Sequence, residues 1–231
     1  MSSNQESQPI RLNKFLAERL GISRREADNL IAEGKVFVND TPVTLGARVD
    51  KNDKVCYNKK IVPFEAEYSY IAFNKPVGYV CSRRTQGDAE TIYAVLPPEF
   101  AALKTVGRLD KDSSGLILLT NDGDFAFEMT HPKFYKEKVY IVDLDRELEP
   151  LHQQMISDYG VQLEDGASKF TVIHEDGPRT HFKVILSEGR NRQIRRTFAA
   201  LGYKVVGLHR IQFGKYQLSG LPEGEWTKIS K

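Results

Sequence analysis

The stretch GRLDKDSSGL, residues 107–116, concentrates side chains that could act directly on a substrate. Asp110 stands between Arg108 and Lys111, and a second carboxylate, Asp112, follows two positions later. A carboxylate in this setting can serve as a nucleophile or accept a proton. The alternative is that Asp110 only caps a turn, which is a common use of an aspartate in a loop.

The residues after this stretch predict a rigid support for it. Residues 117–120 (ILLT) are mostly branched and apolar and end at the turn signal NDG, residues 121–123, which is typical of a buried strand. Residues 107–116 would therefore form a loop fixed to a sheet, and loops on rigid scaffolds often carry catalytic groups. Gly107 and Gly115 would let the backbone approach a ligand closely.

The longer string GRLDKDSSGLILLTNDG resembles the signature loop of the pseudouridine synthases. The resemblance is to the RsuA branch, which includes RluB, RluE and RluF and modifies bacterial ribosomal RNA. In that family the aspartate of GRLD is the catalytic nucleophile, so the resemblance implies this role for Asp110.

Three further stretches extend the resemblance. NKP with Gly78, at residues 74–78, matches part of the family's catalytic sheet. Residues 136–142 (KEKVYIV) alternate in polarity, which predicts a half-buried strand with Lys138 and Tyr140 on one face. Tyr140 matches the family tyrosine that stacks on the target base, although a buried sheet tyrosine is the alternative. Residues 189–196 (GRNRQIRR) resemble a stretch whose basic residue, here Arg195, would pair with Asp110 and keep it ionised.

The reaction implied by the resemblance breaks the glycosidic bond of uridine, turns the uracil over and rejoins it through carbon five. Nothing is added or removed, so we expect no cofactor. The carboxylate could attack the anomeric carbon, add to carbon six of the ring, or remove the proton from the second carbon of the sugar, and the sequence leaves these routes open. All three need an ionised aspartate in a dry pocket. We expect no metal either, because five histidines and two cysteines show no ligand spacing.

Basic residues are concentrated towards the end of the chain. From Lys183 to Lys215 there are eight basic residues and one acidic residue, Glu188, although the whole chain has a formal charge of only +2. We expect the target base to leave its stack and flip into the pocket. The residues predicted to grip the RNA backbone there are Arg108, Arg190, Arg192 and Arg196.

The first part of the chain predicts a small separate domain. Apolar residues at helical spacing precede Gly21, and Ser23 with Glu26 forms a capping box for a second helix over residues 24–33. A hairpin should follow at residues 36–43. The strings RLNKFLA, SRREADNLI and GKVFVND resemble the RNA-binding domain first described in a ribosomal small-subunit protein, which has an alpha-L arrangement. The resemblance implies an RNA-facing surface formed by Arg11, Asn13, Lys14, Arg24, Arg25 and Lys35.

Arg24 and Arg25 would occupy the first turn of a helix, where the macrodipole disfavours cations by a few tenths of a kcal/mol each. RNA phosphates at this helix start would explain the placement, because backbone N–H groups and guanidinium groups both bind anions. That both arginines are solvated surface residues is the alternative.

The predicted fold class is α+β. We expect a disordered head at residues 1–9, the small RNA-binding domain at 10–57, a linker at 58–67, and a catalytic domain at 68–231 with a mixed, mainly antiparallel sheet flanked by helices. No run approaches the ~18 apolar residues needed to span a bilayer, and Cys56 and Cys81 are too few for a disulfide framework. We therefore expect no membrane partner and a cytoplasmic location.

The predicted function is isomerisation of a uridine in ribosomal RNA, with 23S favoured over 16S. The expected partner is ribosomal RNA or a precursor of a ribosomal subunit, and we expect the protein to act as a monomer. A noncatalytic RNA-binding ribosome-assembly factor is the first alternative, and a hydrolase acting on nucleosides is a more remote one.

Overall fold

The computed structural model describes residues 8–65 and 67–231. The described residues fall into two compact units, one with residues up to Ser69 together with 121–123, and one with residues 70–120 and 124–231. The head predicted for residues 1–9 lies, up to residue 7, outside the described residues.

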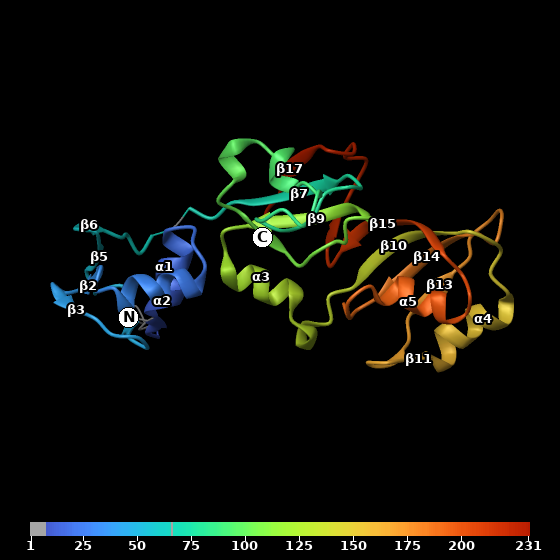
Figure 1. Ribbon diagram of the computed structural model, residues 1–231, viewed down its shortest axis with the longest axis horizontal. Helices are drawn as coiled ribbons and strands as arrows, with labels where there is room; N and C mark the ends of the chain where they lie inside the picture. The colour runs from blue at the N-terminus through green and yellow to red at the C-terminus, as the bar shows by residue number, and fades with distance from the viewer. Residues whose placement is uncertain (1–7, 66) are drawn as a thin grey trace, which may run out of the picture. The chain divides into compact units, whose positions relative to one another are not determined.

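The first unit is a pair of helices with short strands (Figure 1). Its helices are α1 (Leu12–Arg19) and α2 (Arg24–Ala32). Its strands are β1 (Ile10–Arg11), β2 (Val36–Val38), β3 (Thr41–Pro42), β4 (Arg48–Val49), β5 (Val55–Tyr57) and β6 (Lys60–Ile61). Four strands form a sheet in the order β3-β2-β5-β6, and β1 pairs with β4.

Local sequence signals fix these elements. The predicted capping box is present, because the Ser23 hydroxyl accepts a hydrogen bond from the Glu26 backbone N–H (3.1 Å) and the Ser23 N–H donates to Glu26 Oε2 (2.7 Å). Asn39 and Asp40 have φ of 51° and 62°, which suits the tight turn between β2 and β3. The apolar residues of both helices meet the sheet in a core made of Leu12, Phe15, Leu16, Ala27, Ile31, Val36, Val49, Val55 and Val62.

The linker predicted for residues 58–67 starts too early. Asn58 and Lys59 form a second tight turn with φ of 48° and 63°, and β6 then pairs with β5. Val62 is buried in the core of this unit, and the Phe64 ring stacks on Phe15 at 4.4 Å. The polar composition hid this strand, because β6 is only two residues long and exposed.

The second unit is built on one mixed sheet of nine strands within the described part of the chain. The order is β13-β14-β10-β15-β9-β7-β17, with β16 paired to β15 and β8 paired to β9. The strands are β7 (Tyr70–Lys75), β8 (Lys104–Val106), β9 (Ser114–Thr120), β10 (Lys138–Leu144), β13 (Thr171–Ile173), β14 (His181–Leu186), β15 (Val205–Phe213), β16 (Tyr216–Gln217) and β17 (Trp226–Lys228). A separate hairpin consists of β11 (Val161–Leu163) and β12 (Gly166–Ser168).

Helices cover parts of this sheet. They are α3 (Gly123–Thr130), α4 (Pro150–Gln154) and α5 (Gln193–Ala200), with short 3₁₀ turns η1 (Ile92–Ala94), η2 (Pro98–Phe100) and η3 (Pro132–Phe134) and a π-helical turn η4 (Met155–Tyr159). Figure 1 shows α3 beside β9, and α5 with α4 near β13 and β14. On β9, Leu116 and Leu118 belong to the α3-side core and the alternate residues Ile117 and Leu119 belong to the larger core, so this strand is buried on both faces.

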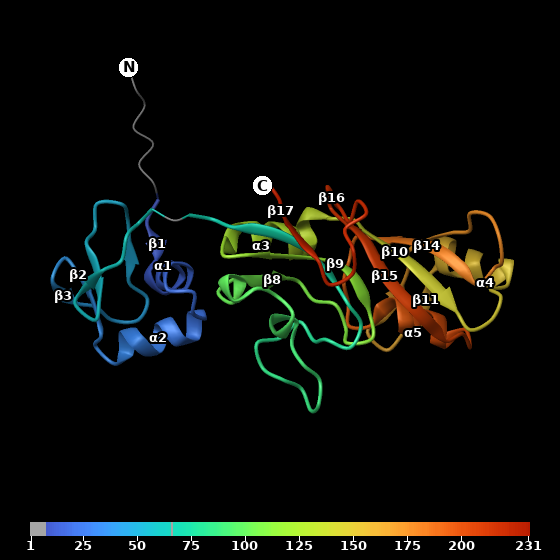
Figure 2. The same cartoon turned by 90° about the horizontal axis from the view of Figure 1, so that it is seen from above.

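Strands β10 and β15 run side by side through the middle of the sheet (Figure 2). β15 pairs in parallel with β9, where Arg210 lies opposite Gly115. On its other edge Arg210 lies opposite Tyr140 and Phe213 lies opposite Lys138, although these β15 residues are three apart and the β10 residues only two. The extra residue forms a β-bulge, which aims Arg210 and Phe213 to the same face as Tyr140 and Lys138.

Gly115 is required at the contact between β9 and β15. Its φ is +104°, and a Cβ added there would lie 2.3 Å from the backbone oxygen of Arg210. Only glycine can therefore occupy this position without moving one strand away from the other.

Several predicted elements differ in extent. β9 begins at Ser114, inside the stretch predicted as loop. Beyond β7, Val80 forms one isolated bridge with Thr91. The helix α4 passes directly into the π-helical turn η4 at Met155. β15, nine residues long, was not predicted.

Candidate active site

A cavity of about 350 Å³ opens in the second unit. It lies between the loop that precedes β9, the start of β10, the end of β15, and the segment that leads into α5. Its charged and aromatic lining consists of Arg108, Asp110, Lys138, Tyr140, Glu188, Arg190, Arg192, Arg210 and Phe213. The two sequence-predicted residues Asp110 and Tyr140 therefore face one space, although they come from different elements.

Asp110 sits in the loop between β8 and β9, and its side chain is 34% exposed. The carboxylate is therefore less shielded from solvent than in the dry pocket that the sequence predicted. The Arg192 guanidinium lies 3.5 Å from Asp110 Oδ2. Arg192 precedes α5 with a left-handed φ of 46°, which is uncommon for a residue with a side chain.

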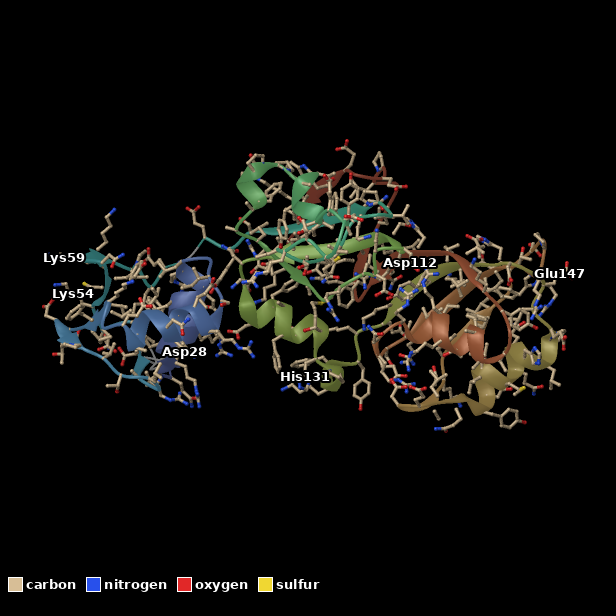
Figure 3. The ribbon with its side chains drawn as sticks, in the orientation of Figure 1. Asp28, Lys54, Lys59, Asp112, His131 and Glu147 are labelled. Carbon is tan, nitrogen blue, oxygen red and sulfur yellow. The ribbon has the colours of Figure 1, made fainter. Side chains whose placement is uncertain are left out.

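Asp112 anchors this arginine. Two nitrogens of Arg192 donate to the two carboxylate oxygens of Asp112 at 2.9 and 2.8 Å. The hydrogen bonds from Arg192 hold the pKa of Asp112 below its ordinary value, and the nearby charge of Arg195 acts in the same direction. Figure 3 labels Asp112 among nitrogen-tipped side chains. Asp112 thus fixes the cation that faces Asp110.

The predicted pairing of Arg195 with Asp110 is replaced by a different arrangement. Arg195 Nη2 donates to the backbone oxygen of Asp112 at 2.7 Å, and its Nη1 donates to the backbone oxygen of Val205. Arg195 is the third residue of α5 and also lies 3.3 Å from Asp112 Oδ2, whereas Arg192 immediately precedes the helix and lines the cavity. Arg195 thus holds the backbone of the loop, and Arg192 faces Asp110.

A buried lysine holds the other side of the loop. Lys75, at the end of β7, has no exposed surface, and its Nζ donates to the backbone oxygens of Ser113 (2.6 Å) and Pro76 (2.9 Å). Burial lowers the pKa of Lys75. The sequence analysis placed this lysine in the catalytic sheet but gave it no role, because a lysine in a short Lys-Pro turn carries no signal of burial.

Tyr140 is almost buried, with 8% of its surface exposed, and belongs to the main core. Its hydroxyl lies 3.5 Å from Nη1 of Arg210, which is 2% exposed. Arg210 is one of the basic residues between Lys183 and Lys215, and the sequence does not predict it as a site residue. Because β15 was not predicted as a strand, no alternation pattern indicated that Arg210 would share a face with Tyr140.

Two predicted RNA contacts are occupied within the protein. Arg196 donates to both carboxylate oxygens of Asp165 at 2.9 and 2.8 Å. Arg190 donates to backbone oxygens of the β11–β12 hairpin and to the side chains of Asp165 and Glu188. These arginines tie the hairpin to the start of α5, which is a role the sequence did not predict. Arg108 is exposed and lines the cavity, and no ion pair of its side chain is found within the described ranges.

The predicted RNA-facing residues of the first unit divide into two groups. Arg11, Arg24 and Arg25 are exposed. The others contact neighbouring side chains: Asn13 donates to Asp28 at 2.9 Å, Lys14 lies 4.0 Å from Glu18, and Lys35 lies 2.6 Å from Glu33. The first group presents guanidinium groups to solvent, and the second presents charges that acidic neighbours partly balance.

Comparison with known families places both units. Residues 69–200 match the model described as RNA pseudouridylate synthase. The chain belongs to this family. Residues 10–62 match the S4 domain, which agrees with the predicted N-terminal RNA-binding domain and includes β6. The enzyme is an RNA pseudouridine synthase of the RsuA type, with the α+β fold that the sequence predicted.

The relatives match over nearly the whole chain. The ribosomal small subunit pseudouridine synthase A of Pasteurella multocida is 37% identical, with 96% of each chain covered. The dual-specificity RNA pseudouridine synthase RluF of Escherichia coli K12 is also 37% identical, with 96% of this chain and 76% of the relative covered. A solved structure entitled crystal structure of pseudouridylate synthase is 33% identical, covers 96% of both chains and has a TM-score of 0.68.

Among residues 8–65 and 67–231, no helix has the length and apolar character that crossing a membrane requires. In the same part of the chain no group of three or more histidine, cysteine or acidic side chains could hold a metal ion.

Proposed function

We propose that this synthase isomerises a specific uridine of ribosomal RNA to pseudouridine, with Asp110 as the catalytic carboxylate and Tyr140 as the aromatic ring against which the target base stacks. The observation that supports this most strongly is that both side chains line one cavity, within the segment that matches the synthase family. The family resemblance of the two motifs assigns the same two roles.

The surroundings of Asp110 suit an ionised carboxylate. Arg192 lies 3.5 Å from it and is itself held by Asp112, and Lys75 and Arg195 fix the backbone of the loop at Ser113 and Asp112. The carboxylate is thus positioned by groups on three different elements, which is what a nucleophile or base needs in order to act at one defined atom. Attack on the anomeric carbon, addition to carbon six and removal of the sugar proton all remain available to it.

The exposed guanidinium groups support RNA binding by both units. Arg108 lines the rim of the cavity, and Arg11, Arg24 and Arg25 are exposed on the S4 unit. Arginines of this kind bind phosphates and dock on structured RNA by shape, because an A-form helix hides its base edges from side chains. We propose ribosomal RNA, free or in a precursor of a subunit, as the partner.

The ribosomal subunit is a separate question. The sequence analysis favours 23S RNA, and this stays a prediction. A 16S target is the second candidate, because two relatives named for the small subunit match over 96–97% of their own length, whereas RluF is longer than the matched region.

The decisive experiment compares the wild-type enzyme with Asp110→Asn on ribosomal RNA from cells that lack the gene. We expect the wild type to introduce pseudouridine at one position of 16S or 23S RNA, located by sequencing after pseudouridine-specific modification. Asp110→Asn should lose this activity and retain RNA affinity, because the amide keeps the shape of the side chain and cannot act as a nucleophile or base. Normal turnover by Asp110→Asn would refute the assignment.

The same assay separates the two alternatives. A noncatalytic assembly factor would bind the RNA and leave no pseudouridine with either protein. A nucleoside hydrolase would release free uracil, which chromatography of the reaction mixture detects.

A further inference from the structure

Two cations lie in the interior wall of the cavity without a carboxylate to balance them. Arg210 is 2% exposed, and Lys138 is half-buried beside it. No acidic side chain lies within 4.0 Å of either cation in the described part of the chain. The nearest candidate, Glu188, offers Lys138 only its backbone oxygen at 3.3 Å, and its carboxylate accepts hydrogen bonds from Arg190 and Gln193.

The hydrogen bonds of Arg210 are incomplete. Its Nε donates to the backbone oxygen of Leu116 at 2.7 Å, and its Nη1 lies 3.5 Å from the Tyr140 hydroxyl. Its Nη2 is buried and has no partner. A buried guanidinium with an unused donor and no counter-ion is costly, and native proteins rarely retain one without a use for it.

The sheet positions this group beside Tyr140. The β-bulge in β15 puts Arg210 on the same face as Tyr140, and the guanidinium carbon lies 5.9 Å from the centre of the Tyr140 ring and 5.0 Å from that of Phe213. The Lys138 ammonium lies 5.3 Å from the same Phe213 ring. Arg210 therefore lies close to the ring on which the uracil would stack, and Lys138 lies beside the same Phe213 ring.

The reaction develops negative charge on the uracil ring, which a nearby positive charge would stabilise. When the bond between C1′ and N1 breaks, its electron pair stays on N1 and spreads to O2 and O4 of the ring. When a carboxylate adds to C6 instead, the π pair of C5 and C6 moves to C5 and O4. All three routes therefore place negative charge on O4 at an early stage. Afterwards C5 bonds to C1′, the proton on C5 leaves, and N1 gains a proton. Donors fixed where charge develops are among the largest contributions to catalysis.

We propose that Arg210 is a further catalytic residue of this enzyme, whose guanidinium group donates a hydrogen bond to O4 of the flipped uracil and stabilises the negative charge of the detached or activated ring, with Lys138 adding to the same positive field. This inference rests on the proposed function. It also explains why the two cations have no acidic partner, since a carboxylate beside them would cancel the field that the ring anion needs.

The test uses a matched pair of substitutions, Arg210→Gln and Arg210→Lys, which are similar in size and differ in charge. The substrate is ribosomal RNA from cells that lack the gene, and turnover and RNA affinity are measured separately. We expect Arg210→Gln to lower kcat about 10²–10³-fold with RNA affinity within threefold of wild type. Arg210→Lys should recover at least tenfold of that loss. Lys228→Gln removes a charge from the exposed strand β17 at the other end of the sheet order and should behave as wild type.

A second substrate distinguishes charge stabilisation from a structural role. RNA containing 5-fluorouridine presents a ring whose anion is already stabilised by fluorine. The ratio of the wild-type rate to the Arg210→Gln rate for reaction of the target nucleotide should therefore be at least tenfold smaller than with uridine. An equal deficit on both substrates, or turnover of Arg210→Gln within threefold of wild type on uridine, would overturn the proposal. If Arg210→Gln does not fold, Lys138→Gln takes its place, with about a tenfold loss expected and the same relief by fluorine.

The wild-type control separates this inference from the function on which it rests. A wild-type enzyme that makes no pseudouridine would overturn the proposed function and the role of Arg210 together. An active wild type with an unaffected Arg210→Gln would overturn the role of Arg210 alone.

Discussion

Replacing Lys138 by Met should stabilise the second unit at neutral pH and not at alkaline pH. Burial, together with the nearby charge of Arg210, lowers the pKa of Lys138 from 10.5 to about 8, and Glu188 acts in the opposite direction. In the unfolded chain the same group titrates near 10.5. Between pH 8 and 10.5 the unfolded chain therefore binds more protons than the folded protein, so stability rises with pH across this window.

The magnitude follows from the two pKa values. The difference between 10.5 and about 8 corresponds to roughly 3 kcal/mol of lost stability below pH 8. Because the ammonium still reaches solvent, screening reduces this figure, and we expect about 1–2 kcal/mol for Lys138→Met at pH 7. Methionine has a similar length and keeps contact with the Phe213 ring. At about 2–4 °C per kcal/mol, the unfolding midpoint should rise by roughly 2–8 °C.

The assay is urea unfolding of both proteins at pH 7 and pH 10, followed by tryptophan fluorescence. The chain contains one tryptophan, Trp226, which packs against Phe100 in the second unit, so the signal reports on this unit. Changes in other titrating groups cancel between the two proteins. The advantage of Lys138→Met should be largest at pH 7 and should fall by more than half at pH 10. A variant that is less stable at pH 7, or an advantage independent of pH, would refute this account of Lys138.

Two further substitutions test the packing that supports the site. Gly115→Ala should destabilise the second unit by several kcal/mol and abolish turnover, because the new Cβ would overlap the Arg210 backbone. Calorimetry of the variant would show a strongly reduced unfolding midpoint. An unchanged midpoint would contradict the close approach of β9 and β15. Ser23→Ala removes the capping hydrogen bond of α2 and should cost about 1 kcal/mol, measured by unfolding of the S4 unit, whereas Ser23→Asn should retain most of it; equal losses in both would argue against the cap.

Much of the fold was accessible from local sequence patterns. The capping box at Ser23 and Glu26 and the tight turn at Asn39 and Asp40 depend on interactions between near neighbours, and β9 is marked by an uninterrupted apolar run. Such patterns predict elements well because a short range of sequence contains all the partners. The loop that carries Asp110 followed from the same run, since it precedes a strand that is buried on both faces.

The parts that the sequence did not predict depend on partners far apart in the chain. β15 carries a buried arginine and a bulge, which interrupt the alternation that marks a strand. Lys75 contacts Ser113, and Arg195 contacts Asp112, across 38 and 83 positions. Which of Arg192 and Arg195 faces Asp110 depends on the left-handed residue before α5, and no spacing rule indicates it. The role of Arg210 followed only once its register opposite Tyr140 was known.

The bulge in β15 makes chain length, rather than composition, the sensitive property of this strand. Side chains on a strand alternate between its two faces. Loss of the single extra residue between Arg210 and Phe213 would therefore move the side chains on one side of the deletion to the opposite face of the sheet. Arg210 would then leave the wall beside Tyr140 even with every other residue intact. The strand should accept many substitutions at its exposed positions and very few insertions or deletions, and this limit applies to engineered variants as well as to natural ones.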